Sequence, residues 1–155
     1  MSYAILKFLH ILGATVILGT GAGIAFFALM AYRTRDAAFV ARTGAVVVIA
    51  DFVFTATAIF VQPITGYLLL RELGLSLAEG WMAASLILYA IAGAFWLPVV
   101  WMQMRMRDLA AAAAAAKAPL PQAYHRLYRI WFAFGFPGFG ATLLIMWLMI
   151  AKPSL

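Results

Sequence analysis

The sequence lacks cysteine altogether and contains few charged residues. None of its 155 residues is a cysteine, which excludes disulfides, zinc–thiolate sites, iron–sulfur clusters and thiol catalysis. Only 10% of the residues are charged, against about a quarter in soluble domains. Hydrophobic residues, in contrast, make up 67% of the chain. A soluble protein this small cannot bury so much apolar surface, so we expect lipid to cover it.

Long apolar runs predict transmembrane helices. A helix needs about 20 apolar residues to cross a hydrocarbon core of about 30 Å, and open strands would leave backbone groups unpaired in lipid. Four stretches qualify, at Ile5–Tyr32, about Gly44–Leu70, about Trp81–Arg105 and about Leu127–Ala151. The first is too long for a signal peptide. The alanine-rich tract after the third predicts a helical extension that ends at Pro119 and Pro121. The sequence therefore predicts an all-α, four-helix transmembrane bundle in a single domain, residues 1–155.

The basic residues predict the orientation of this bundle. Eight of the 11 lysines and arginines lie in or beside two loops: Arg33, Arg35, Arg42, Arg105, Arg107, Lys117, Arg126 and Arg129. Such loops face the cytoplasm, so we expect both termini outside, in a multi-pass protein of the cell inner membrane. The net charge of +6 is explained by this topology, and we expect no nucleic-acid partner.

His10 is the leading candidate for a ligand-binding residue, because polar groups inside a membrane are costly and often functional. On a helix it shares a face with Ala14, Ile17 and Gly21, with Gly13 beside it. A histidine above small residues can leave room for a flat macrocycle and offer a nitrogen to its iron. The same pattern fits a histidine hydrogen-bonded to a neighbouring helix over a tight crossing, and spacing alone favours that second interpretation.

Other polar residues are expected at the same membrane depth as His10. They are Gln62 and Thr65 on the second helix and Ser85 and Tyr89 on the third. With His10 they form a predicted cofactor-binding pocket that opens outward. Pro63 is expected to free a backbone carbonyl near Ile59 for a further hydrogen bond.

Asp51 is the single acid within a predicted span. A buried carboxylate must find a cation or take up a proton. Arg105 or Arg129 could reach it from the cytoplasmic edge, and an ion pair is the favoured interpretation. A proton or cation relay is the alternative.

His125 is the second histidine, near the cytoplasmic end of the fourth helix. His10 and His125 are therefore expected near opposite membrane faces, which excludes a heme held by both within one chain. Gly19 and Gly23 predict a close helix contact, either within the bundle, in a homo-oligomer or with a larger membrane partner.

Several motifs resemble a family of bacterial integral membrane proteins known as domain of unknown function 2269. They are LKFLHILGA around His10, QPITG at 62–66, GWMAASLILY from Gly80, WLPVVWMQMRMRD at 96–108, and RIWFAFGFPGFGA with WLMIAKP at the end. The resemblance covers essentially the whole chain and implies membrane insertion, without implying a reaction.

The opening histidine and the GW at 80–81 are also distantly similar to the membrane-embedded, heme-binding protoporphyrinogen oxidase family. That resemblance implies heme b or a porphyrin at His10, which would then be the metal ligand. The family's lysine after the GW is replaced here by Ser85, so the resemblance implies the binding pocket rather than the oxidase activity.

Three functions remain open from the sequence. The first is a heme- or porphyrin-binding redox protein built on His10. The second is a non-catalytic accessory subunit that packs against a larger complex. The third is a small transporter or proton conductor that uses Asp51. Whether the protein is an enzyme is left undecided.

Overall fold

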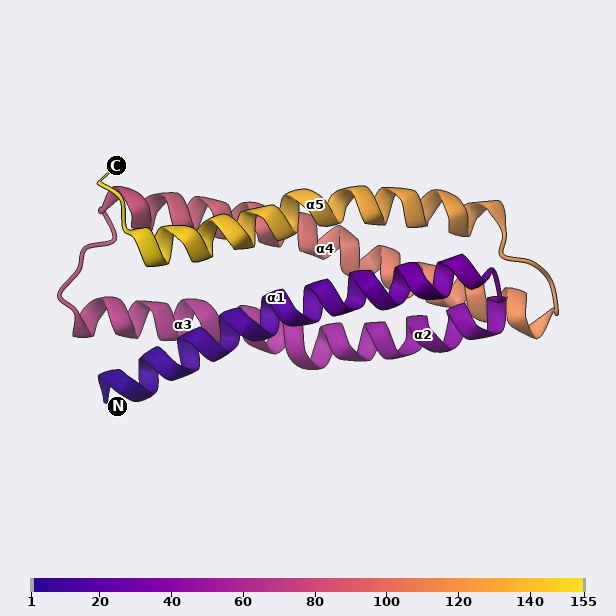
Figure 1. The fold of residues 1–155 in the computed structure, drawn as a ribbon, viewed down its shortest axis with the longest axis horizontal. Helices are drawn as coiled ribbons and strands as arrows, with labels where there is room; N and C mark the ends of the chain where they lie inside the picture. The colour runs from indigo at the N-terminus through magenta and orange to yellow at the C-terminus, as the bar shows by residue number, and fades with distance from the viewer. Residues whose placement is uncertain (1, 155) are drawn as a thin grey trace.

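The computed structural model describes residues 2–154 as long helices joined by short loops. The described residues contain no strand, and four helical stretches are long and apolar enough to cross a membrane, which confirms the all-α prediction. Figure 1 shows both termini at one end of the bundle, here called the terminal end. The loops at 35–36 and 116–121 lie at the other end, which we call the basic end because most lysines and arginines surround these loops.

The first two helices meet in a tight turn at the basic end. Helix α1 spans Tyr3–Thr34, and α2 spans Ala37–Ala50. Asp36 begins α2, because its Oδ1 accepts hydrogen bonds from the backbone N–H of Ala38 at 2.8 Å and of Phe39 at 3.3 Å. An aspartate in this position satisfies backbone donors that a helix leaves free. The second helix therefore begins at Ala37 rather than near Gly44, and this cap is the signal that hydropathy alone misses.

The second span is one continuous helical stretch from Ala37 to Glu72. Helix α2 leads into η1 (Asp51–Ala56), a π-helical segment, and then into α3 (Thr57–Glu72). A π-helix has wider turns than an α-helix and often marks a functional position. The sequence did not predict this segment, which begins at the buried acid Asp51.

The last two helices form a long antiparallel pair. Helix α4 spans Gly80–Ala115 and α5 spans Gln122–Ala151. The predicted alanine-rich extension is therefore helical, and the chain leaves it through Lys117, whose φ is 51°. Pro119 and Pro121 follow in the loop, as residues that cannot continue a helix.

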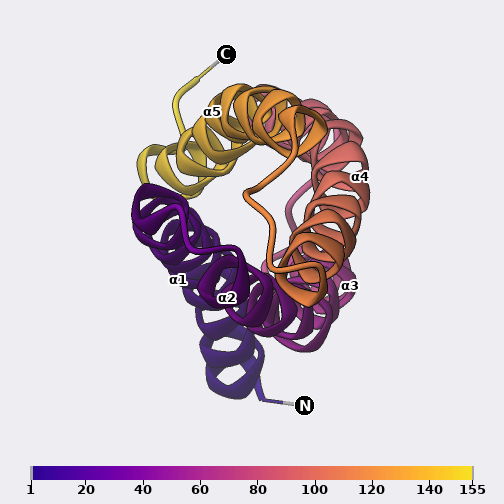
Figure 2. The same ribbon diagram turned by 90° about the vertical axis from the view of Figure 1, so that its right-hand side faces the viewer.

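The helices are arranged in a ring when viewed from the basic end (Figure 2). Helix α4 packs along α5 and against α2, while α1 packs against α2, η1 and α3. The largest cluster of buried hydrophobic residues lies toward the basic end, between α1, α2, α4 and α5. Large side chains such as Phe60, 70% exposed, and Ile150, 72% exposed, cover the outside. Such a surface is stable in lipid and costly in water.

Candidate functional site

His10 is fixed by a hydrogen bond between two helices. Its Nδ1 lies 2.9 Å from Oγ1 of Thr65, which projects from α3 and is 5% exposed. The Thr65 hydroxyl donates its hydrogen to the carbonyl of Val61 at 3.0 Å. With this hydrogen on Val61, Thr65 accepts from His10, and we assign the imidazole proton to Nδ1 on that basis; the opposite tautomer would have Thr65 donate to Nδ1. Nε2 is left with a free lone pair, and no residue between 2 and 154 donates a hydrogen bond to it.

Two glycines allow this close approach of α1 and α3. A Cβ atom at Gly66 would lie 3.1 Å from Cε1 of His10, and one at Gly13 would lie 3.3 Å from Cδ of Gln62. The imidazole and the amide thus occupy the space that the glycines leave. The small residues near His10 accommodate its interhelical contact, which is the tight crossing that the sequence offered as an alternative to a macrocycle site.

The predicted outward pocket is assembled only in part. His10, Gln62 and Thr65 come together between α1 and α3. Tyr89 reaches α3 one turn deeper, where its hydroxyl donates to the carbonyl of Ile59, the carbonyl that Pro63 was expected to free. Ser85 is buried, but its hydroxyl donates to the carbonyl of Trp81 in its own helix at 2.7 Å. The Ser85 hydroxyl therefore bonds to the backbone of its own helix and does not join the His10 cluster.

An apolar groove lies next to this cluster, one turn deeper in the bundle. It has a volume of about 200 Å³ and is lined by α1 and by the η1–α3 segment, with Gly13 and Val61 at its border with the cluster. Ligand pockets for drug-sized molecules usually have about 300–1,000 Å³. The groove is therefore smaller than a usual ligand pocket, and His10 is not among the residues that line it.

Asp51 is buried between α2 and α4 without a counter-charge. It is 3% exposed, and Oδ1 accepts a hydrogen bond from Nε1–H of Trp96 at 3.3 Å. Oδ2 has no hydrogen-bond partner among the described residues, and neither has the hydroxyl of Thr55 one turn further along.

The favoured ion pair of Asp51 with Arg105 or Arg129 is not formed. Both arginines are exposed, and the one salt bridge within residues 2–154 joins Arg107 to Asp108 at 2.8 Å. Arg105 follows the Asp51 partner Trp96 by nine positions on α4, a rise of about 13.5 Å along the axis. The arginine side chains therefore stay at the basic end, while Asp51 lies deeper.

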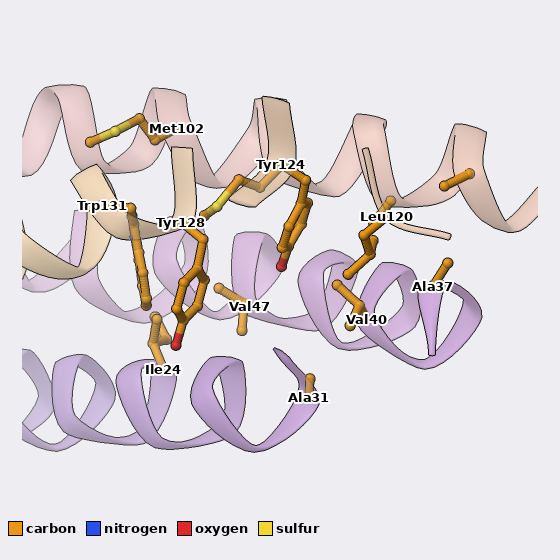
Figure 3. Close-up of a cluster of buried hydrophobic side chains, with 13 residues drawn as sticks. Ile24, Ala31, Ala37, Val40, Val47, Met102, Leu120, Tyr124, Tyr128 and Trp131 are labelled. Carbon is orange, nitrogen blue, oxygen red and sulfur yellow. The ribbon is translucent and has the colours of Figure 1, made fainter. Parts of the chain in front are cut away.

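An aromatic cluster near the basic end was missed by the sequence analysis. Tyr128 stacks on Tyr32 with ring centroids 3.9 Å apart, and Tyr124 stacks on Tyr32 at 6.1 Å. Figure 3 shows Tyr124, Tyr128 and Trp131 pointing from α5 toward α1 and α2. Tyr124 and Tyr128 lie in the first two turns of α5. Only packing determines that both rings face inward, each 5% exposed.

The aromatic cluster borders a small, partly open cavity of about 30 Å³. Its lining includes Thr43 from α2, Gln103 and Arg107 from α4, and Tyr128 and Trp131 from α5. Three of its buried polar atoms have no partner among the described residues: Oε1 of Gln103, the hydroxyl of Tyr128 and Nε1 of Trp131. Unpaired buried polar groups are rare and commonly indicate bound water.

Comparison with known proteins identifies the family. The family model described as "Predicted integral membrane protein (DUF2269)" matches residues 4–153. The chain belongs to this family. No curated protein and no solved structure matches the chain. The distant resemblance to a heme-binding oxidase family therefore stays a prediction for this DUF2269 protein.

The two histidines of this DUF2269 protein lie at opposite ends of the bundle. His125 shares a hydrogen bond of 3.0 Å with the hydroxyl of Tyr32, at the end of α1 opposite to His10. Tyr32 follows His10 by 22 positions on α1, which corresponds to about 33 Å of helix. This separation confirms that one chain cannot hold a heme between both histidines. Across residues 2–154, no three His, Asp or Glu side chains gather in a way that could hold a metal ion, so a metal at His10 would need ligands other than these.

Proposed function

We propose that this DUF2269 protein binds a b-type heme or a related metalloporphyrin through Nε2 of His10. The observation that supports the proposal is the 2.9 Å contact between Nδ1 of His10 and Oγ1 of Thr65, which we assign as Nδ1–H donating to Thr65 while the Thr65 hydroxyl donates to Val61. Metal-binding histidines usually donate their other ring N–H in this way, which fixes the tautomer and orients the ring. His10 would therefore be the residue that holds the metal of the bound group.

The residues around His10 have distinct roles in this proposal. His10 would supply the ligand nitrogen, Thr65 would orient the imidazole, and the apolar groove beside Gly13 would take one edge of the macrocycle. Bound heme supplies one-electron chemistry at its iron. The resulting function is a heme-associated redox protein whose site lies toward the terminal end. We place the basic end in the cytoplasm and the protein in the cell inner membrane, because lysine and arginine concentrate on cytoplasmic loops.

The absorption spectrum of the purified protein tests this proposal. We expect a Soret band in protein isolated from cells supplied with heme precursors, and saturable appearance of the band when hemin is added to the apoprotein in detergent. A colourless protein that also shows no saturable hemin binding would contradict the proposal.

A second candidate function is that of a subunit that packs against another membrane protein or a second copy of itself. It is supported by Gly19 and Gly23 of α1. No atom of another helix within the described chain lies within 4 Å of the Cβ position of either glycine. Two small residues four apart let helix backbones approach in lipid, and inside this bundle that approach is unused.

We expect Gly19→Leu to dissociate such an assembly, because its side chain would hold two backbones apart. The mass of the protein–detergent complex, measured by light scattering during size-exclusion chromatography, gives the oligomeric state. Gly93→Leu is the matched control, because Gly93 on α4 also meets no other helix among the residues described. If the wild-type protein is oligomeric and Gly19→Leu has the same mass, the helix face that carries Gly19 and Gly23 is excluded as the contact.

A further inference from the structure

We propose that Asp51 is a proton-binding site that exchanges its proton with the basic end through a hydrated cavity between α1, α2, α4 and α5. This inference concerns the interior of the bundle and is independent of heme binding at His10. It assigns a role to Asp51, to Gln103 and to the cavity, none of which the His10 site uses.

The surroundings of Asp51 favour a neutral carboxyl group. Its side chain is almost completely buried, and its single hydrogen bond comes from the uncharged indole of Trp96. Among the described residues no charged side chain forms an ion pair with Asp51. The polar side chains that act on its carboxyl group are those of Thr55 and Trp96, and both are uncharged. An isolated carboxylate in an apolar interior is strongly destabilised, whereas a protonated one could donate from Oδ2. The site therefore suits a proton.

The cavity has the size and chemistry to hold water. A cavity must have a volume of about 10–15 Å³ and offer two to four polar partners to hold one water molecule. This cavity has a volume of about 30 Å³. Gln103 supplies an acceptor, and Tyr128 and Trp131 supply donors, all three being 5% exposed and without other partners in the described chain. About one or two waters would pair these groups, which are otherwise costly to bury.

The cavity and Asp51 follow one another along the α2–α4 interface. Thr43, Val47 and Asp51 are four residues apart on the second span, and the first two line the cavity. Asp51 therefore lies one turn beyond the cavity wall, a rise of about 6 Å. The route therefore requires at least one further water between the cavity and the carboxyl, held by hydrogen bonds of about 2.8 Å. On α4, Gln103 lines the cavity and Trp96, about two turns away, contacts the carboxyl.

The other end of the cavity reaches the charged surface. Arg107 lines it and pairs with exposed Asp108 at 2.8 Å, so the cavity wall meets the basic end there. The remaining titratable groups on the wall are Tyr124 and Tyr128. The π-helical turn that begins at Asp51 widens the helix at the inner end of this route, a position where π-helical turns often serve function.

Infrared spectroscopy of the purified protein tests the inference. The other four acids, Asp36, Glu72, Glu79 and Asp108, are exposed to solvent, whereas Asp51 is 3% exposed. A carbonyl stretch from a protonated carboxyl at neutral pH should therefore come from Asp51 and disappear in Asp51→Asn. Exchange of the carboxyl proton for deuterium shifts this band, so the time course of the shift after transfer to D₂O gives the rate of proton exchange. Absence of the band in the wild-type protein would overturn the proposal.

The route is tested with Gln103→Leu, which removes a polar group from the cavity wall. We expect proton exchange at Asp51 to slow by about tenfold, the effect of losing about one hydrogen bond from the path. Met102→Leu is the matched control, because Met102 is a buried neighbour on the same helix and does not line the cavity. Equal exchange rates in the two variants would reject the cavity as the route.

A chemical measurement keeps the proposal testable if Asp51→Asn does not fold. Dicyclohexylcarbodiimide enters membranes and modifies protonated carboxyl groups. In the wild-type protein we expect modification at Asp51, identified by peptide mass spectrometry, and a decrease as the pH rises. Modification that is absent, or that sodium ions suppress at constant pH, would overturn the assignment of a proton site. None of these measurements requires heme.

Discussion

Replacing His10 with alanine is expected to abolish heme binding by this DUF2269 protein. The substitution removes the imidazole whose Nε2 is free, while the Thr65 hydroxyl keeps its hydrogen bond to Val61. No other histidine can replace the ligand, because His125 lies at the basic end. The Soret band of the purified variant, normalised to protein concentration, measures the effect. A band of wild-type intensity and position in His10→Ala would contradict the assignment.

The role of Thr65 separates ligand binding from a purely structural hydrogen bond. In Thr65→Val the Nδ1–H of His10 loses its acceptor, and loss of such a partner typically weakens metal binding by about 10–100-fold. Thr65→Ser keeps the hydroxyl and should restore the wild-type affinity in hemin titrations. If Thr65→Val bound hemin as tightly as Thr65→Ser, the imidazole would not be oriented by this contact.

Gly66→Val is expected to destabilise the protein by separating α1 from α3. Even a Cβ atom at this position would lie 3.1 Å from the imidazole of His10, and the branched side chain adds two further methyl groups. Overpacking of this kind costs about 1–3 kcal/mol, and the displaced hydrogen bond to Thr65 adds about 0.6 kcal/mol. Reversible unfolding by SDS in mixed micelles measures the change in free energy.

Gly93→Val provides the control for Gly66→Val. It makes the same substitution inside a long helix, at a position where no atom of another helix in the described structure lies within 4 Å of the Cβ. The change in helix propensity is therefore matched, and the difference between the two variants reports the contact with His10. A loss of stability at Gly93 as large as that at Gly66 would mean that the helix itself, rather than the crossing, is sensitive.

The composition and the long apolar runs predicted the class of fold correctly. Four spans follow from hydropathy because lipid requires long, internally hydrogen-bonded segments. The separation of the histidines also followed from the sequence, since helical rise converts residue numbers into membrane depth. The freed carbonyl of Ile59 was predictable too, because the loss of a backbone donor at Pro63 is a local property.

The rotation of each helix about its axis was decided by tertiary packing alone. His10 faces Thr65 on α3, Ser85 bonds within α4, and Asp51 faces an indole in place of an arginine. Packing also decides that the rings of Tyr124 and Tyr128 face the interior of the bundle. A transmembrane helix is apolar on every side, so its sequence carries little amphipathic signal to fix its rotation. The sequence determines how deep each polar group lies in the membrane, and contacts between helices determine which group it meets.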